Sequence, residues 1–387
     1  MKIAVVGAGP AGLYFALLAK KHDPSHDIRV YEKNVAGATY GWGVVFSDVG
    51  MTFLRDADPD FHALFTAHHE RCDYMEIVHH GEHVQVHGNH FSRTSRLHML
   101  RLLQQECERL GVHIEYGHRI DDVQALASEV ELLVAADGGN SAVRAQFSDH
   151  FRPSFEKRRN KFAWYGTHQR FHAVSLIFRQ CEQGTFIAHA YQYSPELSTF
   201  LIEVDPDTWR DARLDRASED ESRQFCENVF RSDLGSNGLL TNRSVWFEAN
   251  VVRNERWSYG NIVLLGDALR TVHFSLGSGT RMAMQDAIAL QAALASSPGD
   301  LSAAFVSFEA TRRPQSSTFQ TAATRSLAWY ESVADRLHLD PVSFTYDYMR
   351  RTGQVSHDDL KRRDPHFVAA YEASHPEIYR HLSSGLA

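Results

Sequence analysis

The first 33 residues constrain the fold more strongly than any other part of the chain. An apolar run at 3–6 precedes a glycine-rich turn, GAGPAG at 7–12, which is followed by a helical segment at 13–21 and a second strand at 28–32. Four consecutive apolar residues are typical of a strand that is buried on both faces of a parallel sheet. This order predicts a strand–turn–helix–strand unit at the start of an α/β sheet.

The residues of this unit suit a dinucleotide. Gly7 permits a tight turn, Gly9 lets the backbone approach a pyrophosphate, and Gly12 lets helix and strand pack closely. The free N–H groups and the dipole at the helix start favour the same anion. Glu32, twenty residues after Gly12, ends the second strand, where a carboxylate accepts hydrogen bonds from ribose hydroxyls. We therefore predict a dinucleotide site, with a purely structural glycine turn as the alternative.

Length and charge exclude some classes of protein. A chain of 387 residues predicts two domains, although one elaborated domain is the alternative. The net charge of −8 disfavours non-specific binding of nucleic acid. No apolar run approaches the ~18 residues that a membrane span needs. The four cysteines form no CxxC pair, which is typical of reduced thiols, so we expect a soluble, cytoplasmic protein.

Residues 37–48 combine glycines with aromatic residues. Because glycine permits unusual backbone angles and close approach to a ligand, a loop over a cofactor is one interpretation. A surface turn with Trp42 packed into the core is the other.

Nine of the 23 histidines lie between residues 62 and 98. A metal site is one interpretation, but no HExxH motif and no nearby cysteine pair supports it. The alternation of Val84 and Val86 instead indicates a hairpin that carries solvated imidazoles. We expect no metal.

A helix is predicted at 95–110, with Ser95 as its N-cap and Gly111 as its stop. Arg96 falls in the first turn, where the helix dipole disfavours a cation. This suggests an anionic partner for Arg96, such as a phosphate, and an exposed arginine is the alternative.

Two further strands end in an aspartate beside glycine. The strand at 131–136 runs into Asp137 and Gly138, with a helix beginning near Ser141, and the strand at 261–265 runs into Gly266 and Asp267. Open α/β sheets bind ligands at such strand ends. Glycine-bearing residues 277–280 precede another helix, whose start offers N–H groups to an electron-rich ligand edge. Simple turn-forming roles are the alternative in each case.

Residues 151–247 differ in character. Segments at 164–167, 175–178, 186–191 and 198–204 are typical of successive strands of an antiparallel sheet, and a helix is predicted at 218–234. We predict a second domain whose sheet covers a pocket.

These stretches, in this order and spacing, resemble the single-component flavoprotein monooxygenases, the aromatic hydroxylases. The resemblance covers nearly the whole chain. It implies an α/β fold with a Rossmann-like FAD-binding domain on a parallel sheet and a substrate domain on an antiparallel sheet. FAD would bind in an extended form, and NADH or NADPH would dock transiently as reductant, since no second Rossmann motif is present. The cofactor-binding residues that the resemblance implies are Gly7, Gly9, Ala11, Gly12, Glu32, Lys33, Val44, Arg96, Asp137, Asp267, Gly277, Gly279 and Thr280.

The same resemblance implies a division of the chain. The FAD-binding domain is expected at 1–70, 91–150 and 250–320, the substrate domain at 71–90 and 151–249, and a C-terminal helical segment at 321–387. The implied activity is hydroxylation of an electron-rich aromatic ring: NAD(P)H reduces FAD, O₂ forms a C4a-hydroperoxide, and its distal oxygen attacks the ring.

Four segments, at 41–48, 164–167, 198–203 and 273–279, are similar to salicylyl-CoA 5-hydroxylases and to the flavin portion of anthraniloyl-CoA monooxygenases. The violacein-pathway hydroxylases, which oxidise an indole ring, are similar over the same segments. The chain departs from the acyl-CoA group at Leu269 and Arg270, where Ala-His is usual, and from the wider family at Phe274, where proline is usual. An aryl-CoA thioester is the expected substrate and an indole the alternative. An FAD-dependent oxidase or isomerase without oxygen incorporation is an alternative of another class.

His273 and Phe274 are the candidate catalytic residues. An imidazole near neutrality accepts a phenol or amine proton, and Phe274 would form the substrate-side wall of the flavin. A histidine merely packed under Phe274 is the alternative. Arg270 is expected either to pair with a substrate anion or to lie on the surface.

Overall fold

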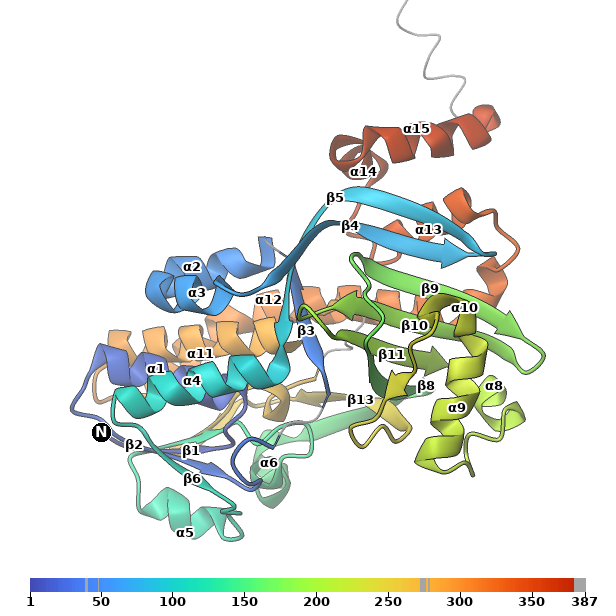
Figure 1. Ribbon diagram of the computed structural model, residues 1–387. Coiled ribbons are helices and arrows are strands. Elements are labelled where there is room, and N and C mark those ends of the chain that lie inside the picture. Colours follow the sequence, from blue (N-terminus) through green and yellow to red (C-terminus); the bar gives the residue numbers. More distant parts are fainter. Residues whose placement is uncertain (39–40, 48, 272–275, 278, 379–387) are drawn as a thin grey trace, which may run out of the picture.

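The computed structural model describes residues 1–38, 41–47, 49–271, 276–277 and 279–378, and two sheets organise it (Figure 1). The smaller sheet has six strands, and its pairings are parallel except for the one between β14 and β15. Its spatial order is β14 (Ser258–Tyr259), β15 (Ile262–Leu264), β7 (Leu132–Ala135), β1 (Lys2–Val6), β2 (Asp27–Glu32) and β6 (His113–Tyr116).

The larger sheet has nine strands and is antiparallel except for the parallel pairing of β4 with β9. Its spatial order is β12 (Leu239–Leu240), β8 (Pro153–Thr167), β11 (Ser198–Val204), β10 (Gly184–Gln192), β9 (Val174–Cys181), β4 (Glu70–His79), β5 (Glu82–Ser95) and β3 (Gly43–Ser47), with β13 (Phe247–Asn254) also paired to β8. The mixed α/β fold with a parallel and an antiparallel sheet is thus confirmed.

Helices surround both sheets (Figure 1). The helices that accompany the strands of the smaller sheet are α1 (Pro10–His22), α4 (Arg96–Arg109), α5 (Val123–Ser128), α6 (Ala142–Gln146), α7 (Ser148–Phe151) and α11 (Gly279–Ser296). The others are α2 (Thr52–Ala57), α3 (Pro59–Thr66), α8 (Pro206–Asp211), α9 (Glu219–Val229), α10 (Arg231–Leu234), α12 (Leu301–Glu331), α13 (Pro341–Arg350), α14 (His357–Arg363) and α15 (Pro365–Ser374). Short 3₁₀ turns occur at η1 (Val49–Met51), η2 (Gly266–Ala268) and η4 (Val333–Arg336).

Local sequence signals explain where the helices begin. The Ser95 hydroxyl accepts a hydrogen bond from the His98 N–H at 3.3 Å and caps α4, as predicted. Ser218 and Glu221 form a capping box at the start of α9. These caps satisfy backbone N–H groups that have no partner within the helix, so they fix the residue at which each helix starts.

Three apolar clusters hold the elements together. The first joins the smaller sheet to α1, α4 and α11. The second packs one face of the larger sheet against α9 and α10, through residues such as Phe186 and Phe230. The third packs the opposite face against α12 and α13, where Phe178 and Ile187 meet Trp329 and Phe344. This last face continues toward the candidate active site.

Two sequence interpretations need correction. The predicted loop at 37–48 is wrong for residues 43–47, which form strand β3 and pair with β5. The histidine-rich hairpin is present as β4 and β5, but His79 is not solvated. It is 2% exposed and its ring stacks on Phe344 with centroids 4.0 Å apart. Sequence alternation could not reveal this because α13 belongs to a distant part of the chain.

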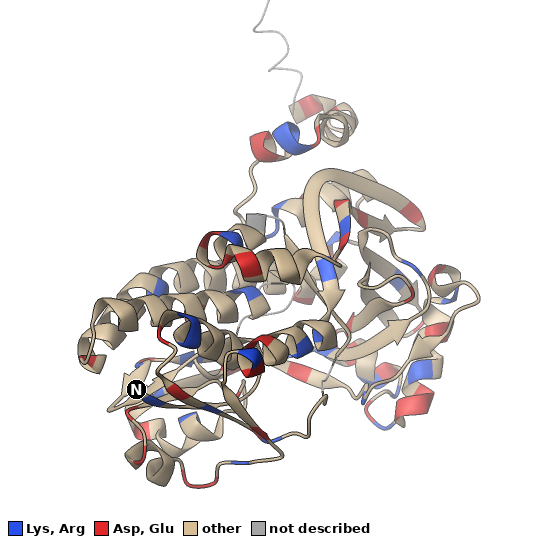
Figure 2. Ribbon diagram, turned by 60° about the vertical axis from the view of Figure 1, so that its left-hand side comes forward, with Lys and Arg blue, Asp and Glu red and all other residues tan. Residues whose placement is uncertain are grey.

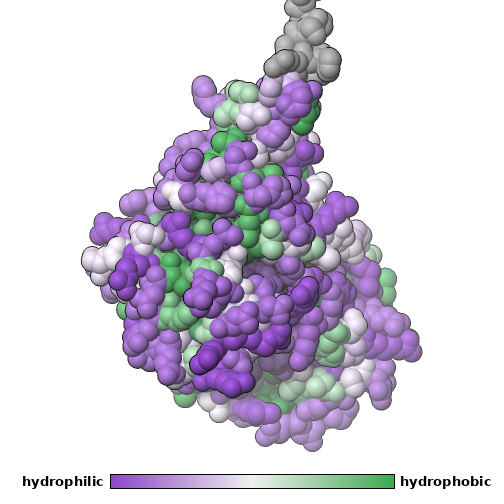
Figure 3. All heavy atoms as spheres, turned by 90° about the vertical axis from the view of Figure 1, so that its right-hand side faces the viewer, coloured by the Kyte–Doolittle hydropathy of each residue, from purple (hydrophilic) through white to green (hydrophobic). Residues whose placement is uncertain are grey.

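Basic and acidic residues are interspersed along the helices and strands (Figure 2). The face on the right-hand side of Figure 1 is mainly hydrophilic, with hydrophobic residues in separate patches (Figure 3). Within the described ranges, no helix is both long and apolar enough to cross a membrane. The same ranges contain no group of three His, Cys, Asp or Glu side chains that could hold a metal ion.

Candidate active site

The turn between β1 and α1 requires its glycines for two different reasons. Gly7 has a φ of 107°, and a Cβ there would lie 2.3 Å from the carbonyl oxygen of Ala136. A Cβ at Gly12 would lie 2.1 Å from the carbonyl oxygen of Gly7, so α1 packs directly on the turn. At Gly9, a Cβ would meet nothing within 4 Å, and no side chain caps α1. The first turn of α1 therefore presents its N–H groups to open space, as an anion site requires.

Glu32, at the end of β2, holds this turn. Its Oε2 accepts from the Ala8 N–H at 2.9 Å, and its Oε1 accepts from the backbone and side-chain amides of Asn34 at 2.9 and 2.7 Å. A carboxylate has about four acceptor positions, so Glu32 retains capacity for a hydroxyl donor. The adjacent Lys33 is exposed.

Asp267 is brought next to α1 by the turn that follows β15. Gly266 has a φ of 59°, and a Cβ there would lie 2.8 Å from the Cβ of Ala11. The Asp267 side chain is open to a cavity, but the protein around it raises its pKa by desolvation, while Arg96 and Arg270 oppose that rise. The Gly266–Asp267 turn and the glycine turn at 7–12 therefore meet in space, as expected for one ligand that contacts both.

Arg96 opens α4 and lines the same cavity as Asp267. Desolvation lowers the pKa of its guanidinium, and the attraction of Asp267 opposes this. The sequence predicted an anionic partner for Arg96, and the structure places the Asp267 carboxylate in the same cavity, where its charge acts on Arg96. The interpretation as an exposed arginine is wrong because the side chain is half-buried. A phosphate partner stays a prediction.

Asp137 follows β7 and caps α6. Its Oδ2 accepts from the N–H groups of Ala142 and Val143 at 2.7 and 3.2 Å, so the turn-forming role is present. Its Oδ1 is buried and has no hydrogen-bond partner in the described part of the chain. Buried polar atoms are almost always satisfied, and a ligand hydroxyl is a suitable partner here.

A cavity of about 610 Å³ is the candidate active site. It is lined by the larger sheet, by the starts of α4 and α11, and by the end of α13. The predicted cofactor residues that line it are Val44, Arg96, Asp267, Gly277, Gly279 and Thr280. The glycine turn, Glu32, Lys33 and Asp137 do not line it and lie instead at the carboxyl ends of β1, β2 and β7. The predicted residues thus fall into two neighbouring groups.

Strand β3 forms one wall of the cavity, so the segment that was predicted as a loop does approach the site. All five of its residues line the cavity. Gly277 has a φ of 60°, and a Cβ there would lie 3.3 Å from the Val45 Cγ1, so the start of α11 comes close to β3. The Tyr191 hydroxyl donates to the carbonyl oxygen of Gly43 at 2.9 Å and ties β3 to β10.

The sheet wall of the cavity is largely apolar, as a planar aromatic ligand requires. Its apolar members include Met75, Phe91, Trp164, Val174, Leu176, Leu201, Phe247, Val251 and Val252. Strand register brings them together, since His189 on β10 pairs with Leu176 on one side and with Leu201 on the other. His189 is therefore a polar group in the middle of an apolar surface.

Sequence reasoning missed His189 and its partner Glu203. The His189 Nε2 lies 2.9 Å from Oε2 of Glu203, whose side chain is fully buried. Asn160 donates to the other oxygen of Glu203 at 2.7 Å. Because the carboxylate accepts a proton-bearing Nε2, the neutral imidazole keeps Nδ1 as its basic nitrogen. No linear motif signals this arrangement, because the register of β8, β10 and β11 creates it.

Arg281, in the first turn of α11, is another cavity residue that sequence reasoning missed. Burial lowers the pKa of its guanidinium, and Arg312 lowers it further. Its Nε is buried and has no hydrogen-bond partner among the residues that the structure describes. A cation in this environment favours an anionic or electron-rich ligand edge. Its position directly after the glycine-bearing helix start was the available signal.

The surface role considered for Arg270 is wrong. This residue is 5% exposed and makes two hydrogen bonds of 2.8 Å with the carboxylate of Asp286. Arg312 Nε also binds that carboxylate at 2.8 Å. The ionic partner of Arg270 is thus a protein carboxylate. The two candidate catalytic residues, His273 and Phe274, lie outside the described residues, and their roles stay predictions.

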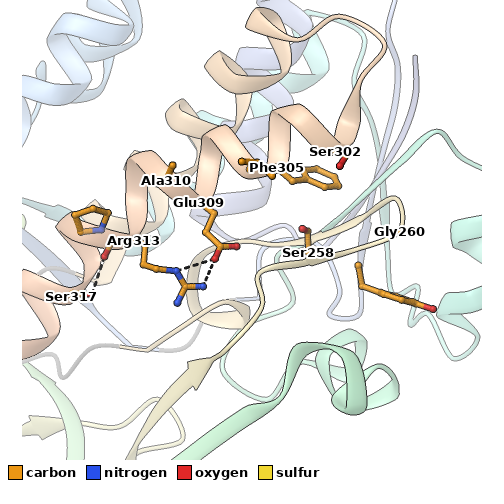
Figure 4. Close-up of a pocket in the computed structure, with 11 residues that line it drawn as sticks. Ser258, Gly260, Ser302, Phe305, Glu309, Ala310, Arg313 and Ser317 are labelled. Carbon is orange, nitrogen blue, oxygen red and sulfur yellow. Dashed lines mark hydrogen bonds and ion pairs between the residues drawn. The ribbon is translucent and has the colours of Figure 1, made fainter.

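A groove of about 800 Å³ between β14 and α12 is unrelated to this site (Figure 4). Its charged lining residues, Glu309 and Arg313, pair with each other. None of the predicted site residues that the structure describes lines it. Among its described lining residues, this groove therefore offers no unpaired Asp, Glu, Lys or Arg for catalysis.

The glycine turn at 7–12 and the Gly266–Asp267 turn both lie within the part of the chain that matches a known family. The family model described as "FAD binding domain" matches residues 1–317. The chain belongs to this family of flavoproteins. Salicyloyl-CoA 5-hydroxylase of Streptomyces sp is 35% identical over 95% of this chain and 72% of its own length. Protodeoxyviolaceinate monooxygenase of Chromobacterium violaceum is 34% identical over 91% of this chain and 94% of its own length.

The fold agrees with this assignment. The structure of 2-methyl-3-hydroxypyridine-5-carboxylic acid oxygenase superposes with a TM-score of 0.66 at 17% identity, covering 94% of this chain and 97% of that one. The family match and the two similar hydroxylases together make the protein an FAD-dependent aromatic monooxygenase. Its residues fit FAD, because the flavoprotein presents the open Gly9 turn, the unsatisfied Asp137 oxygen and the unsatisfied Arg281 nitrogen.

The glycine turn of this flavoprotein gives a paired prediction. Gly12→Ala should lower both the stability of the protein and its affinity for FAD, because the new Cβ would lie 2.1 Å from a backbone oxygen. We expect a loss of about 1–3 kcal/mol in the free energy of unfolding. Gly9→Ala is the matched control: stability should be unchanged, while FAD affinity still falls, because the added methyl faces the ligand. Urea denaturation and flavin fluorescence measure the two effects. Equal stability of the two variants would contradict the packing described for α1.

Proposed function

We propose that this protein uses NADH or NADPH and O₂ to hydroxylate an electron-rich aromatic ring carried as an aryl-CoA thioester, such as salicyloyl-CoA. One oxygen atom enters the ring, the other leaves as water, and NAD(P)H is oxidised to NAD(P)⁺. The observation that carries the proposal is the cavity in which an apolar sheet wall with one His–Glu pair stands close to Asp267 and the start of α11. The similarity to a salicyloyl-CoA hydroxylase supports the choice of thioester.

Each part of the site has a task in this proposal. FAD, when bound, supplies the electron transfer and oxygen chemistry. The N–H groups of α1 and Arg96 would bind its phosphates, Glu32 and Asp267 would accept hydrogen bonds from its hydroxyls, and Arg281 with the start of α11 would hold its electron-rich ring. The apolar wall orients the substrate ring and excludes water from it.

His189 is the group that we assign to proton transfer. Attack of an electrophilic oxygen is easier on a ring whose hydroxyl or amine has lost a proton, and a neutral imidazole accepts such a proton. Glu203 holds the ring tautomer through Nε2 and stabilises the imidazolium that forms. Asn160 in turn holds Glu203.

Replacing His189 by Gln tests this assignment. We expect kcat for hydroxylation to fall about 100-fold, the range typical of a lost general base, with FAD affinity within about twofold of wild type. His273→Gln is the parallel variant, because His273 was the candidate from sequence. Product formation is measured by mass spectrometry for both variants, and it should fall in the variant that lacks the proton acceptor. An unchanged kcat in His189→Gln, with a fall in His273→Gln, would assign the proton to His273 instead.

The similarity to protodeoxyviolaceinate monooxygenase supports an indole as the alternative substrate, since the two proteins are 34% identical over most of both chains. Incubation of FAD-loaded protein with NAD(P)H and either salicyloyl-CoA or tryptophan-derived indoles separates the two. Oxygenated product from the thioester alone supports the proposal, and product from the indole alone overturns it. Oxidation of NAD(P)H without oxygenated product from either would favour the oxidase or isomerase class.

A further inference from the structure

A second groove adjoins the cavity and differs from the rest of the molecule in charge. It has a volume of about 870 Å³ and lies between the end of α12, η4, α13 and the start of α14. Its charged lining residues, besides His375, are four arginines and one carboxylate: Arg325, Arg336, Arg350, Arg351 and Asp347. The protein as a whole carries a net charge of −8, so this excess of cations is local.

The one carboxylate among the described residues that line the groove is already hydrogen-bonded. Asp347 accepts from Arg336 Nε at 2.8 Å and from Trp329 Nε1 at 2.6 Å. This leaves the charges of Arg325, Arg350 and Arg351 in excess of the acidic residues that line the groove. The guanidinium group is the side chain best suited to bidentate binding of phosphate.

Arg351 connects the groove to the candidate active site, because it lines both. Its guanidinium lies 3.8 Å from the centroid of the Tyr348 ring, and its Nε donates to the Ser326 hydroxyl at 3.0 Å. Tyr348 also lines the cavity. A ligand that extends past Arg351 would have one end against the apolar sheet wall and the other among the arginines.

We propose that this groove binds the phosphate groups of the CoA part of the substrate thioester, while the aryl group lies in the cavity. This inference rests on the proposed function. CoA carries a pyrophosphate and a 3′-phosphate at the end of a long pantetheine arm, so an arginine-lined groove next to an aromatic site matches its distribution of charge. The other phosphate-bearing ligands are assigned elsewhere or bind transiently: FAD belongs to the glycine turn and Asp267.

The test is a charge substitution that leaves the cavity intact. Arg325 and Arg350 line the groove and do not line the cavity, so the double variant Arg325→Gln/Arg350→Gln changes the groove alone. The control is Arg55→Gln/Arg216→Gln, since both of these side chains are more than half exposed and lie outside the groove. KM and kcat are measured with salicyloyl-CoA and, separately, KM with NADH and NADPH.

We expect KM for salicyloyl-CoA to rise at least about 10-fold in the groove variant, as lost charge-assisted phosphate contacts predict, with kcat within about twofold of wild type. KM for NADH and NADPH should not change, and the control variant should match wild type. An unchanged KM for the thioester would overturn the proposal. A raised KM for NADPH or NADH in place of the thioester would also overturn it and assign the groove to the reductant.

A binding experiment separates this inference from the proposed function. Calorimetric titration of FAD-loaded protein with free CoA needs no turnover. CoA should bind to wild type and to the control variant, with affinity that falls as salt is added, and at least about 10-fold more weakly to the groove variant. Absence of CoA binding to wild type would contradict the groove assignment. Failure to hydroxylate any aryl-CoA, with CoA binding intact, would contradict the proposed function only.

Discussion

Replacing Asp286 by Asn should lower the free energy of unfolding by about 3–5 kcal/mol, the range found when one partner of a buried ion pair is removed. Asp286 is fully buried and is the shared partner of Arg270 and Arg312, whose side chains are each 4% exposed. The substitution would leave two buried guanidinium groups without their carboxylate. Urea denaturation at neutral pH, followed by circular dichroism, measures the loss.

The matched control for this prediction is Asp56→Asn. Asp56 is 69% exposed in its pair with Arg55, and exposed pairs contribute at most about 1 kcal/mol. The control should therefore lie close to wild type. A loss below about 1 kcal/mol in Asp286→Asn would contradict the view that this triad ties the end of the Gly266–Asp267 turn to α11 and α12.

Replacing Asp267 by Ala should raise the Kd for FAD about 10- to 100-fold, as expected for lost hydrogen bonds to a charged group. Asp267 follows the Gly266 turn beside α1 and shares the cavity with Arg96, so its loss would remove the proposed acceptor of an FAD hydroxyl and the negative charge nearest in effect to Arg96. Fluorescence titration of the apoprotein with FAD gives the Kd. Asp267→Asn keeps one acceptor oxygen and should fall between wild type and Asp267→Ala. Full FAD affinity in Asp267→Ala would refute the role of this carboxylate.

The parts of the site that were predictable from the sequence are those that depend on local chain geometry. The glycine turn, the strand that ends at Glu32, the N-cap Ser95 and the strand that precedes Asp267 each combine a residue type with a position in one element. Their physical causes, such as a φ that only glycine adopts freely, act within a few residues. Sequence patterns therefore contain them.

The parts that were missed depend on contacts between distant segments. His189 and Glu203 lie on neighbouring strands, and only the register of β10 and β11 shows that they form a pair. Arg270, Asp286 and Arg312 come from a loop and two helices. The sequence predicted a loop at strand β3 because glycines flank this segment. Its strand conformation is instead determined by pairing with β5.

The most direct test of the central claim is a labelling experiment. FAD-loaded protein is supplied with NADH or NADPH, salicyloyl-CoA and ¹⁸O₂, and the thioester product is analysed by mass spectrometry. The proposed function predicts one ¹⁸O atom in the ring of the product and one equivalent of NAD(P)H oxidised for each product molecule. Consumption of NAD(P)H with no ¹⁸O in the thioester would contradict aryl-CoA hydroxylation.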